Sequence, residues 1–283
     1  MIRMSPKSVD LLILGAGWTS TFLIPQLDHA AISWAATTTT GHDGTIPFKF
    51  DPGSSDSAQY DKLPSARTVL ITFPLKGPGL SRQLTSMYRK SHGDGNNWIQ
   101  LGSTGIFTNT HWNTNNSSYD TNNVRAIAED ELRQCVSGCV LNLSGLYGGT
   151  RNPSDWVTRV AKTKEQVKAK QALHLVHGDD VANAIIAVHR TFTPGKRWLV
   201  TDLHVYDWWD LMHAWAPVAE EKAKEKLGLE EAEKLEYRKW VVELMDEDNV
   251  RALPRSAETL GRVLDSRDFW KAVGAWPIRG RVV

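Results

Sequence analysis

Short apolar runs alternate with amphipathic segments over about the first 150 residues of this 283-residue chain. Strands connected through helices lie parallel in one sheet. The pattern predicts an α/β fold with a doubly wound parallel sheet. The expected strands are Asp10–Leu14, Ala31–Thr38, Ile46–Phe50, Thr68–Phe73, Trp98–Leu101 and Val140–Leu143, and the expected helices are Trp18–Asp28, Leu80–Ser91 and Asn122–Ser137.

A glycine-rich turn joins the first predicted strand to the first predicted helix. It reads GAGWTS at residues 15–20 and matches the dinucleotide fingerprint G-x-G-x-x-G except at its third glycine. The two glycines permit a tight turn and a close approach of phosphate to the backbone, and the helix N-terminus offers free N–H groups. Ser20 adds only a hydroxymethyl group, so we predict a Rossmann-type phosphate site here. A strand–helix turn without a ligand is the alternative.

The end of the second predicted strand bears on the choice of cofactor. Residues 36–42 read ATTTTGH. NAD enzymes often place an acidic residue there, on the ribose hydroxyls, and this segment has none. It has no Arg or Lys for a 2′-phosphate either, but Thr38, Thr39 and His42 can hydrogen-bond a phosphate. The sequence therefore favours NADP over NAD.

After Asn152 the pattern changes. Helices are expected at Asp155–Leu173, Asp179–Arg190, Tyr206–Trp215 and Glu220–Asp246, with strands at His174–His177 and Arg197–Thr201. We expect one compact unit with two parts. Residues 1–152 and 174–201 form the Rossmann part, and residues 153–173 and 202–283 form a smaller, mostly helical part that binds substrate.

Composition narrows the class of protein. Hydrophobic residues make up 41% of the chain and charged residues 23%, the profile of a globular protein, and the net charge of +1 favours neither nucleic acid nor an anionic membrane as partner. No apolar run reaches membrane-spanning length. Cys135 and Cys139 have no histidine cluster nearby, so we expect no metal site and two ordinary thiols. The short segment before the first strand leaves no room for a signal peptide, and we expect a cytoplasmic protein.

Three further motifs follow in order. QLGSTGIF at 100–107 resembles the S-S-x-x-V-Y-G segment of extended short-chain dehydrogenases/reductases, LYGGTRNP at 146–153 resembles their Y-G-P-G-R-N-P turn, and HGDDVA at 177–182 resembles their H-V-D-D-V-A element. With the G-x-G-W opening, the chain resembles the NAD-dependent epimerase/dehydratase-like members of this superfamily, and most closely the atypical YeeZ-like group. The resemblance covers most of residues 10–200.

The resemblance implies a role for particular residues. Asp51 would lie near the adenine, although it could simply begin a turn before Pro52. Ser103 matches the catalytic serine that hydrogen-bonds the substrate carbonyl. Members of the family often pair through four helices, which implies a homodimer. The other implied cofactor contacts are Gly15, Gly17, Trp18, Thr19 and Ser20 at the pyrophosphate, Phe73, Pro74 and Leu75 beneath the adenosine ribose, and Leu146 and Tyr147 near the nicotinamide.

The family's catalytic Y-x-x-x-K pair is altered in this chain. Arg125, four residues before Glu129, takes the lysine position, and Thr121 stands where the tyrosine is expected. A phenol titrates near pH 10 and a neighbouring cation can lower its pKa, whereas an alkyl hydroxyl cannot act as acid or base near neutrality. Arginine keeps its charge. Tyr119 or His111 could supply the proton instead, although both could be ordinary loop residues.

Three functions stay open on the sequence. The first is NAD(P)-dependent oxidation, reduction or epimerisation of a small carbonyl or sugar-like substrate, with Ser103 orienting the oxygen. The second is an NAD(P)-binding redox sensor without turnover, which the missing tyrosine favours. The third is a Rossmann-like domain that binds no nucleotide.

Overall fold

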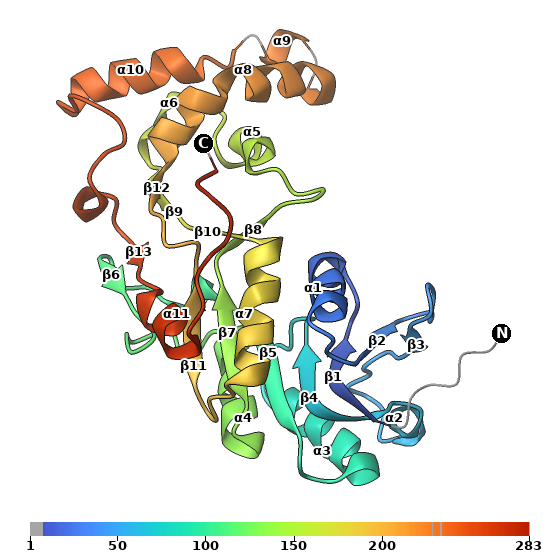
Figure 1. The fold of residues 1–283 in the computed structure, drawn as a ribbon. Helices are drawn as coiled ribbons and strands as arrows, with labels where there is room; N and C mark the ends of the chain where they lie inside the picture. Colours follow the sequence, from blue (N-terminus) through green and yellow to red (C-terminus); the bar gives the residue numbers. More distant parts are fainter. Residues whose placement is uncertain (1–7, 228, 233, 283) are drawn as a thin grey trace.

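The structure is a computed structural model that describes residues 8–227, 229–232 and 234–282. Its centre is a sheet of seven parallel strands in the order β11-β7-β5-β4-β1-β2-β3 (Figure 1). The order reverses direction at β1, so the sheet is doubly wound and the predicted fold class is confirmed. The strands are β1 (Ser8–Leu14), β2 (Trp34–Thr38), β3 (Ile46–Pro47), β4 (Ser65–Ile71), β5 (Asn97–Ser103), β7 (Cys139–Leu143) and β11 (Arg197–Val200).

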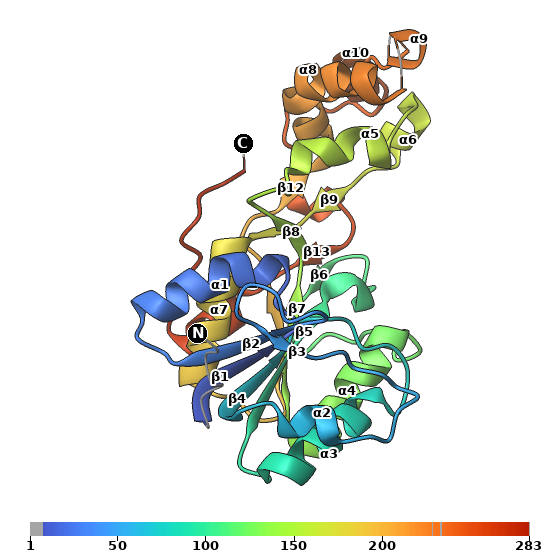
Figure 2. The same cartoon turned by 90° about the vertical axis from the view of Figure 1, so that its right-hand side faces the viewer.

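Helices cover both faces of the sheet. On one face lie α1 (Trp18–His29), α7 (Gly178–Arg190) and α11 (Arg267–Val273), and on the other α2 (Ala58–Asp61), α3 (Leu80–His92) and α4 (Val124–Val136) (Figure 2). Along β1, Leu11 and Ile13 pack on the first face while Leu12 and Leu14 pack on the second. This alternation of buried side chains to both faces explains why the last four residues of β1 form a continuous apolar run.

A second, smaller part has its own apolar core, beyond the carboxyl ends of the strands (Figure 1). Trp209, Tyr237 and Leu244 are among its fully buried side chains. The part contains η2 (Pro153–Trp156), α5 (Val157–Val160), α6 (Lys164–Lys168), β9 (Ala172–Leu173), β12 (Tyr206–Asp207), α8 (Trp208–Leu227), α9 (Leu229–Ala232) and α10 (Tyr237–Glu247).

Short elements link the two parts. β8 (Gly145–Tyr147) pairs in parallel with β10 (Leu175–His177), and β6 (Trp112–Asn113) pairs in parallel with β13 (Val263–Leu264). Two single 3₁₀ turns, η1 (Thr104–Ile106) and η3 (Ala257–Thr259), complete the described elements.

Three predicted helices differ from those observed. The helix predicted at Tyr206–Trp215 begins at Trp208, after β12, and continues to Leu227. The segment predicted as one helix, Asp155–Leu173, is broken because Ala161 is extended (φ −151°) and Thr163 then caps α6 through a bond from the Gln166 N–H to its Oγ1 (3.3 Å). The predicted helix Glu220–Asp246 is also not one element. Its first residues continue α8, and α10 begins afresh at Tyr237.

The observed packing divides the chain differently near its C-terminus. We expected residues 202–283 to belong to the smaller part, but α11 packs against α7 and β11 on the sheet. Phe269, Trp270 and Val273 are buried in the same core as β1, and the Trp270 indole donates a hydrogen bond to the Thr201 carbonyl (3.0 Å). Three large apolar side chains therefore hold this segment on the sheet.

Candidate functional site

The turn between β1 and α1 is built around Gly15. Its φ is +94°, and a Cβ there would lie 2.8 Å from Oγ1 of Thr72, so a side chain is excluded. The Gly15 N–H donates to Thr37 Oγ1 (2.9 Å), and the Thr72 hydroxyl donates to the Gly15 carbonyl (2.5 Å). Side chains of β2 and the β4 end thus clamp the turn on both sides.

Gly17 stands at the N-cap of α1, where no side chain caps the helix. A Cβ built at Gly17 would meet nothing within 4 Å. The backbone is therefore open to a ligand at a helix N-terminus, where free N–H groups and the helix dipole favour an anion.

The three residues after Gly17 point away from this opening. Thr19 and Ser20 are buried, and Ser20 Oγ has no hydrogen-bond partner among the described residues. The Trp18 indole donates to the carbonyl of Gly148 (3.1 Å), and the Arg151 guanidinium lies 4.2 Å from the centre of the Trp18 ring. Of the predicted pyrophosphate residues, only Gly15 and Gly17 line the cavity described next, and Trp18 instead joins α1 to the turn after β8.

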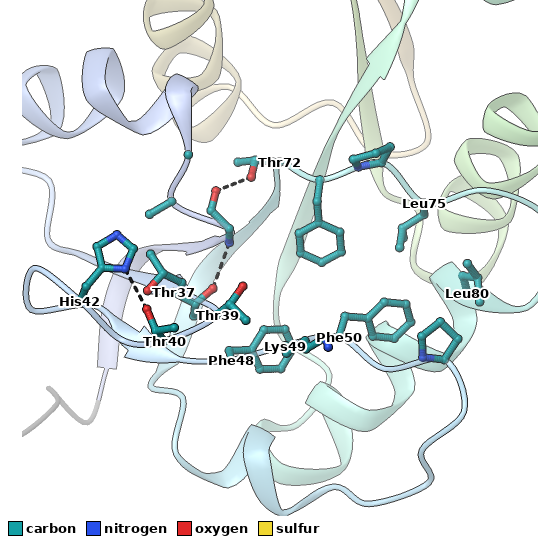
Figure 3. A pocket seen from close by; sticks show the side chains of 17 residues that line it. Thr37, Thr39, Thr40, His42, Phe48, Lys49, Phe50, Thr72, Leu75 and Leu80 are labelled. Atoms are coloured by element: carbon teal, nitrogen blue, oxygen red, sulfur yellow. Dashed lines mark hydrogen bonds between the residues drawn. The ribbon is translucent and has the colours of Figure 1, made fainter.

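A cavity of about 670 Å³, here called the cofactor cavity, opens at the carboxyl ends of β1, β2 and β4 (Figure 3). Threonines and His42 from the end of β2 form one side, and aromatic side chains form another. The Phe50 and Phe73 rings are nearly parallel, with centroids 6.2 Å apart. Its lining comprises Gly15, Ala16, Gly17, Thr37, Thr38, Thr39, Thr40, His42, Phe48, Lys49, Phe50, Pro52, Thr72, Phe73, Pro74, Leu75 and Leu80.

The structure brings five further predicted residues into this cavity: Thr38, Thr39, Phe73, Pro74 and Leu75. Asp51 is not among the lining residues. It is exposed, and its Oδ1 accepts a hydrogen bond from the Gly53 N–H (2.9 Å), which is the turn-forming arrangement named as its alternative.

Sequence reasoning missed Lys49 and the two phenylalanines beside it. We expected a strand over Ile46–Phe50, but β3 ends at Pro47 and the following residues turn into the cavity. Lys49 is exposed, and no carboxylate among the described residues lies within ion-pair distance of it. The signal was the FKF triplet itself, a cation between two aromatic residues at a strand end.

Ser103, Leu146 and Tyr147, which were predicted to lie near the nicotinamide or the substrate, lie on β5 and β8, outside the lining of the cofactor cavity. Ser103 ends β5, and its Oγ accepts a hydrogen bond from the Gly105 N–H (3.2 Å), which leaves its own hydrogen to donate. Leu146 packs on the core of the sheet. The Tyr147 ring packs against His177 (4.9 Å), and burial, with Asp202 and Asp180 nearby, raises the pKa of Tyr147.

Thr121 and Arg125, which were predicted to replace the catalytic pair, lie in different elements. α4 begins at Val124, so Thr121 lies in the exposed turn before it. Arg125 donates from Nη2 to the Leu101 carbonyl (3.0 Å). Tyr119 donates its hydroxyl to both carboxylate oxygens of Asp130 (2.9 Å each). His111 is exposed, and its carbonyl accepts from the Val263 N–H (3.1 Å).

A buried ionic network, also missed by sequence reasoning, lies behind Ser103. Glu129 is fully buried and accepts from the Ser103 N–H (3.3 Å) and from Asn142 Nδ2 (2.8 Å), and it is paired with Arg197. Arg197 also donates to Asp130 (2.9 Å). Burial alone would lower the pKa of Arg197, but the two carboxylates hold that pKa above its usual value. The Arg197 guanidinium at the centre of the network keeps its charge near neutrality.

A separate titratable group lies at the start of α7. Asp180 Oδ1 accepts from the backbone N–H groups of Ile278 (2.6 Å) and Arg279 (3.3 Å), while Oδ2 is buried without a partner among the described residues. Burial raises the pKa of Asp180 to about 6. This carboxyl ties the C-terminal segment to the helix.

The described residues contain no group of three or more His, Cys, Asp or Glu side chains arranged to hold a metal ion. Within the same ranges, no helix combines the length and apolar character needed to cross a membrane.

Comparison with known proteins gives the class of fold. No family model matches the sequence, and no curated protein matches it. Solved structures do match, with UDP-N-acetylglucosamine 4-epimerase from Bacillus cereus at a TM-score of 0.60 and 9% identity over 96% of this chain and 94% of that one. Vestitone reductase from alfalfa matches at 0.58 and 14% identity, over 93% and 92%. dTDP-glucose 4,6-dehydratase from Bacillus anthracis, in complex with NAD, matches at 0.56 and 10% identity, over 96% and 92%.

These identities establish a shared fold. The chain has the α/β fold of the epimerase/dehydratase-like and reductase proteins among its structural neighbours.

Proposed function

We propose that the protein binds a nicotinamide dinucleotide in the cofactor cavity, as an atypical short-chain dehydrogenase/reductase of the YeeZ-like group. The observation that carries this proposal is the open N-terminus of α1, where Gly17 leaves the backbone uncovered at the mouth of the cavity. When bound, the nicotinamide supplies hydride transfer. A solved neighbour with the same fold holds NAD.

We further propose that NADP is preferred over NAD. The four residues after β2 include no carboxylate, and the next residue, Asp43, does not line the cavity, so no acidic side chain of the lining selects the free ribose hydroxyls. Lys49 and His42 both line the cavity beside Thr39 and Thr40 (Figure 3), and a phosphomonoester carries nearly two negative charges at neutral pH. Lys49 thus provides the cation that the segment after β2 lacks. With both cysteines free, we place the protein in the reducing cytoplasm.

The first test uses a matched pair of substitutions at Gly17. Its φ of −108° suits any residue, and there is open space for a side chain, so Gly17→Ser and Gly17→Asp should both fold. Both side chains can cap α1, but only aspartate places a negative charge where the pyrophosphate binds. NADPH binding is measured by quenching of tryptophan fluorescence.

We expect Gly17→Asp to weaken NADPH binding at least tenfold beyond Gly17→Ser, with no loss of thermal stability. Equal NADPH affinity in the two variants would mean that no phosphate binds at this turn. Titration of the wild type with NADPH and with NADH tests the preference, and tenfold tighter binding of NADH would contradict it.

As an enzyme, the protein would oxidise, reduce or epimerise a small carbonyl or sugar-like substrate. The Ser103 hydroxyl supports this reading because its hydrogen is free to be donated to a carbonyl oxygen. Loss of NADPH consumption in Ser103→Ala, on any carbonyl probe that the wild type reduces, would support the role of Ser103. Unchanged turnover in that variant would contradict it.

A second candidate function is an NAD(P)-binding redox sensor without turnover. The position of Tyr119 favours it, because its hydroxyl donates to Asp130 and Thr121 lies outside α4. Neither residue then takes the place of the tyrosine that the family pattern puts before Arg125. The double variant Tyr119→Phe, His111→Ala tests this candidate. Reduced turnover in the variant would mean that Tyr119 or His111 takes part in catalysis, which contradicts a sensor without turnover. Tight NADPH binding without turnover on a broad set of carbonyl probes would support the sensor.

A further inference from the structure

A second concave site lies away from the cofactor cavity. It measures about 490 Å³ and is formed by the turn after β8 and by η2 and α5. In Figure 1 the α5 helix of the smaller part lies above α1. Three cationic side chains line it: Arg151, Arg159 and Lys162. We call it the basic cavity.

The charge of the basic cavity is not neutralised locally. Among the residues that the structure describes, no carboxylate forms an ion pair with Arg151, Arg159 or Lys162. The one acidic residue of the lining, Asp155, is already paired with Lys222 of α8. Three unpaired cations facing one hollow repel one another in the absence of an anion.

Arg151 is exposed, but both its guanidinium and its backbone make defined contacts. Its guanidinium stacks on the Trp18 ring at 4.2 Å, and its backbone exchanges hydrogen bonds with Gly148 (2.9 and 3.1 Å). Trp18 is itself fixed by its bond to the Gly148 carbonyl (3.1 Å). A stacked guanidinium keeps its in-plane N–H groups available for the oxygens of an anion.

Neutral donors complete the lining. Asn152 uses its Oδ1 to accept from the Ser154 N–H (3.1 Å), which leaves its amide N–H₂ to donate. Thr158 adds a hydroxyl at the start of α5. Cations together with an amide and a hydroxyl form the donor set that recognises a tetrahedral oxyanion.

We propose that the basic cavity binds a phosphate group, either free or as the monoester of a small molecule. Three cations match a dianion better than they match a single carboxylate. The hollow accommodates a phosphate with a small organic body, and the net charge of +1 gives the chain no extended field for a nucleic acid. The site goes beyond the proposed cofactor binding and does not depend on it.

The site also has a built-in reporter. Trp18 contacts Arg151 on one side and belongs to the turn of the cofactor cavity on the other. Phosphate bound to Arg151 therefore changes the surroundings of an indole that also senses the cofactor turn.

The test is a titration with inorganic phosphate, with and without saturating NADPH. Binding is measured by calorimetry and by broadening of the ³¹P line. The variant Arg159→Gln, Lys162→Gln removes two of the three cations and leaves Arg151 and Trp18 untouched. The control variant Lys90→Gln, Lys271→Gln makes the same change in net charge at exposed positions outside the cavity. All four substituted side chains are exposed, so both variants should fold.

We expect saturable phosphate binding in the wild type, weakened at least tenfold in the cavity variant and less than twofold in the control. Equal weakening in both variants, or no saturable binding up to tens of millimolar, would overturn the proposal. Phosphate that competes with NADPH but binds the wild type and the cavity variant equally well would also overturn the proposal. That phosphate would occupy the glycine turn of the cofactor cavity.

A protein that does not bind NADPH still gives a valid phosphate comparison, so the two proposals fail separately. Glycerol phosphate distinguishes the two ligand sources. Binding at least as tight as that of inorganic phosphate assigns the cavity to a monoester, whereas exclusion of glycerol phosphate assigns it to the free anion.

Discussion

Lys49 offers the sharpest test of how the cofactor cavity distinguishes its ligands. It is a cation in the lining without an ion-pair partner among the described residues, on the same cavity as Thr39, Thr40 and His42. If the 2′-phosphate of NADP binds there, Lys49→Gln should weaken NADPH binding and leave NADH binding unchanged. NADH serves as an internal control because it differs from NADPH only by that phosphate.

The magnitude follows from the exposure of the lysine. Two unit charges about 4 Å apart in water interact by about 1 kcal/mol, and a phosphate of nearly two charges doubles this figure. Physiological salt, with a Debye length of about 8 Å, screens it back to roughly 1 kcal/mol. Lys49→Gln should therefore raise the Kd for NADPH roughly five- to tenfold.

The assay is a fluorescence titration of each nucleotide at two salt concentrations. Lys62→Gln is the control, because Lys62 is an exposed lysine nearby that does not line the cavity. The wild-type preference for NADPH should shrink at high salt, and the preference of the Lys49 variant should change less. Equal weakening of NADPH and NADH, or no change in either, would refute the assignment of Lys49 to the 2′-phosphate.

Three further substitutions test other parts of the structure. Gly15→Ala forces a side chain into a backbone at φ +94° and 2.8 Å from Thr72, so it should cost roughly 1–2 kcal/mol in chemical denaturation and abolish tight NADPH binding; wild-type affinity would contradict the clamped turn. Gly102→Ala would place a Cβ 2.6 Å from Glu129 Oε1, and its thermal unfolding should show a loss of about 1–3 kcal/mol. Burial raises the pKa of Asp180 from its ordinary value of 3.8 to about 6, so between these pH values the folded state binds a proton that the unfolded state has released. Stability should therefore fall by up to about 3 kcal/mol as the pH rises from about 4 to 6. Asp180→Asn should remove that slope, and a variant that keeps it would assign the slope to another group.

The sequence predicts the N-terminal half of the sheet well, for local reasons. β1 and β4 each end in a short apolar run, and Gly15 and Gly17 lie where a strand meets a helix, so short-range pattern is enough. Phe73, Pro74 and Leu75 line the cavity because they lie at or just beyond the end of a predicted strand, where ligands bind in open α/β sheets.

The rest depends on contacts between residues far apart in the chain. Arg197 meets Glu129 across 68 positions, and no local pattern brings these two together. Trp18 fits the fingerprint as a phosphate contact, but Gly148 and Arg151 draw its indole to the other side of the turn. Tyr119 is close in sequence to the altered pair, yet its hydroxyl bonds to Asp130, eleven residues away.

The position of α11 has a consequence for how the chain is made. Phe269, Trp270 and Val273 share one core with Leu11 and Ile13, so the face of the sheet under α1 and α7 is complete only when the last helix has been synthesised. When only the first 200 residues have left the exit tunnel of the ribosome, one apolar face of the sheet is still partly uncovered. Nascent chains that stop before Arg267 should therefore be cut rapidly by protease within α7, and protection should appear only when α11 has left the exit tunnel.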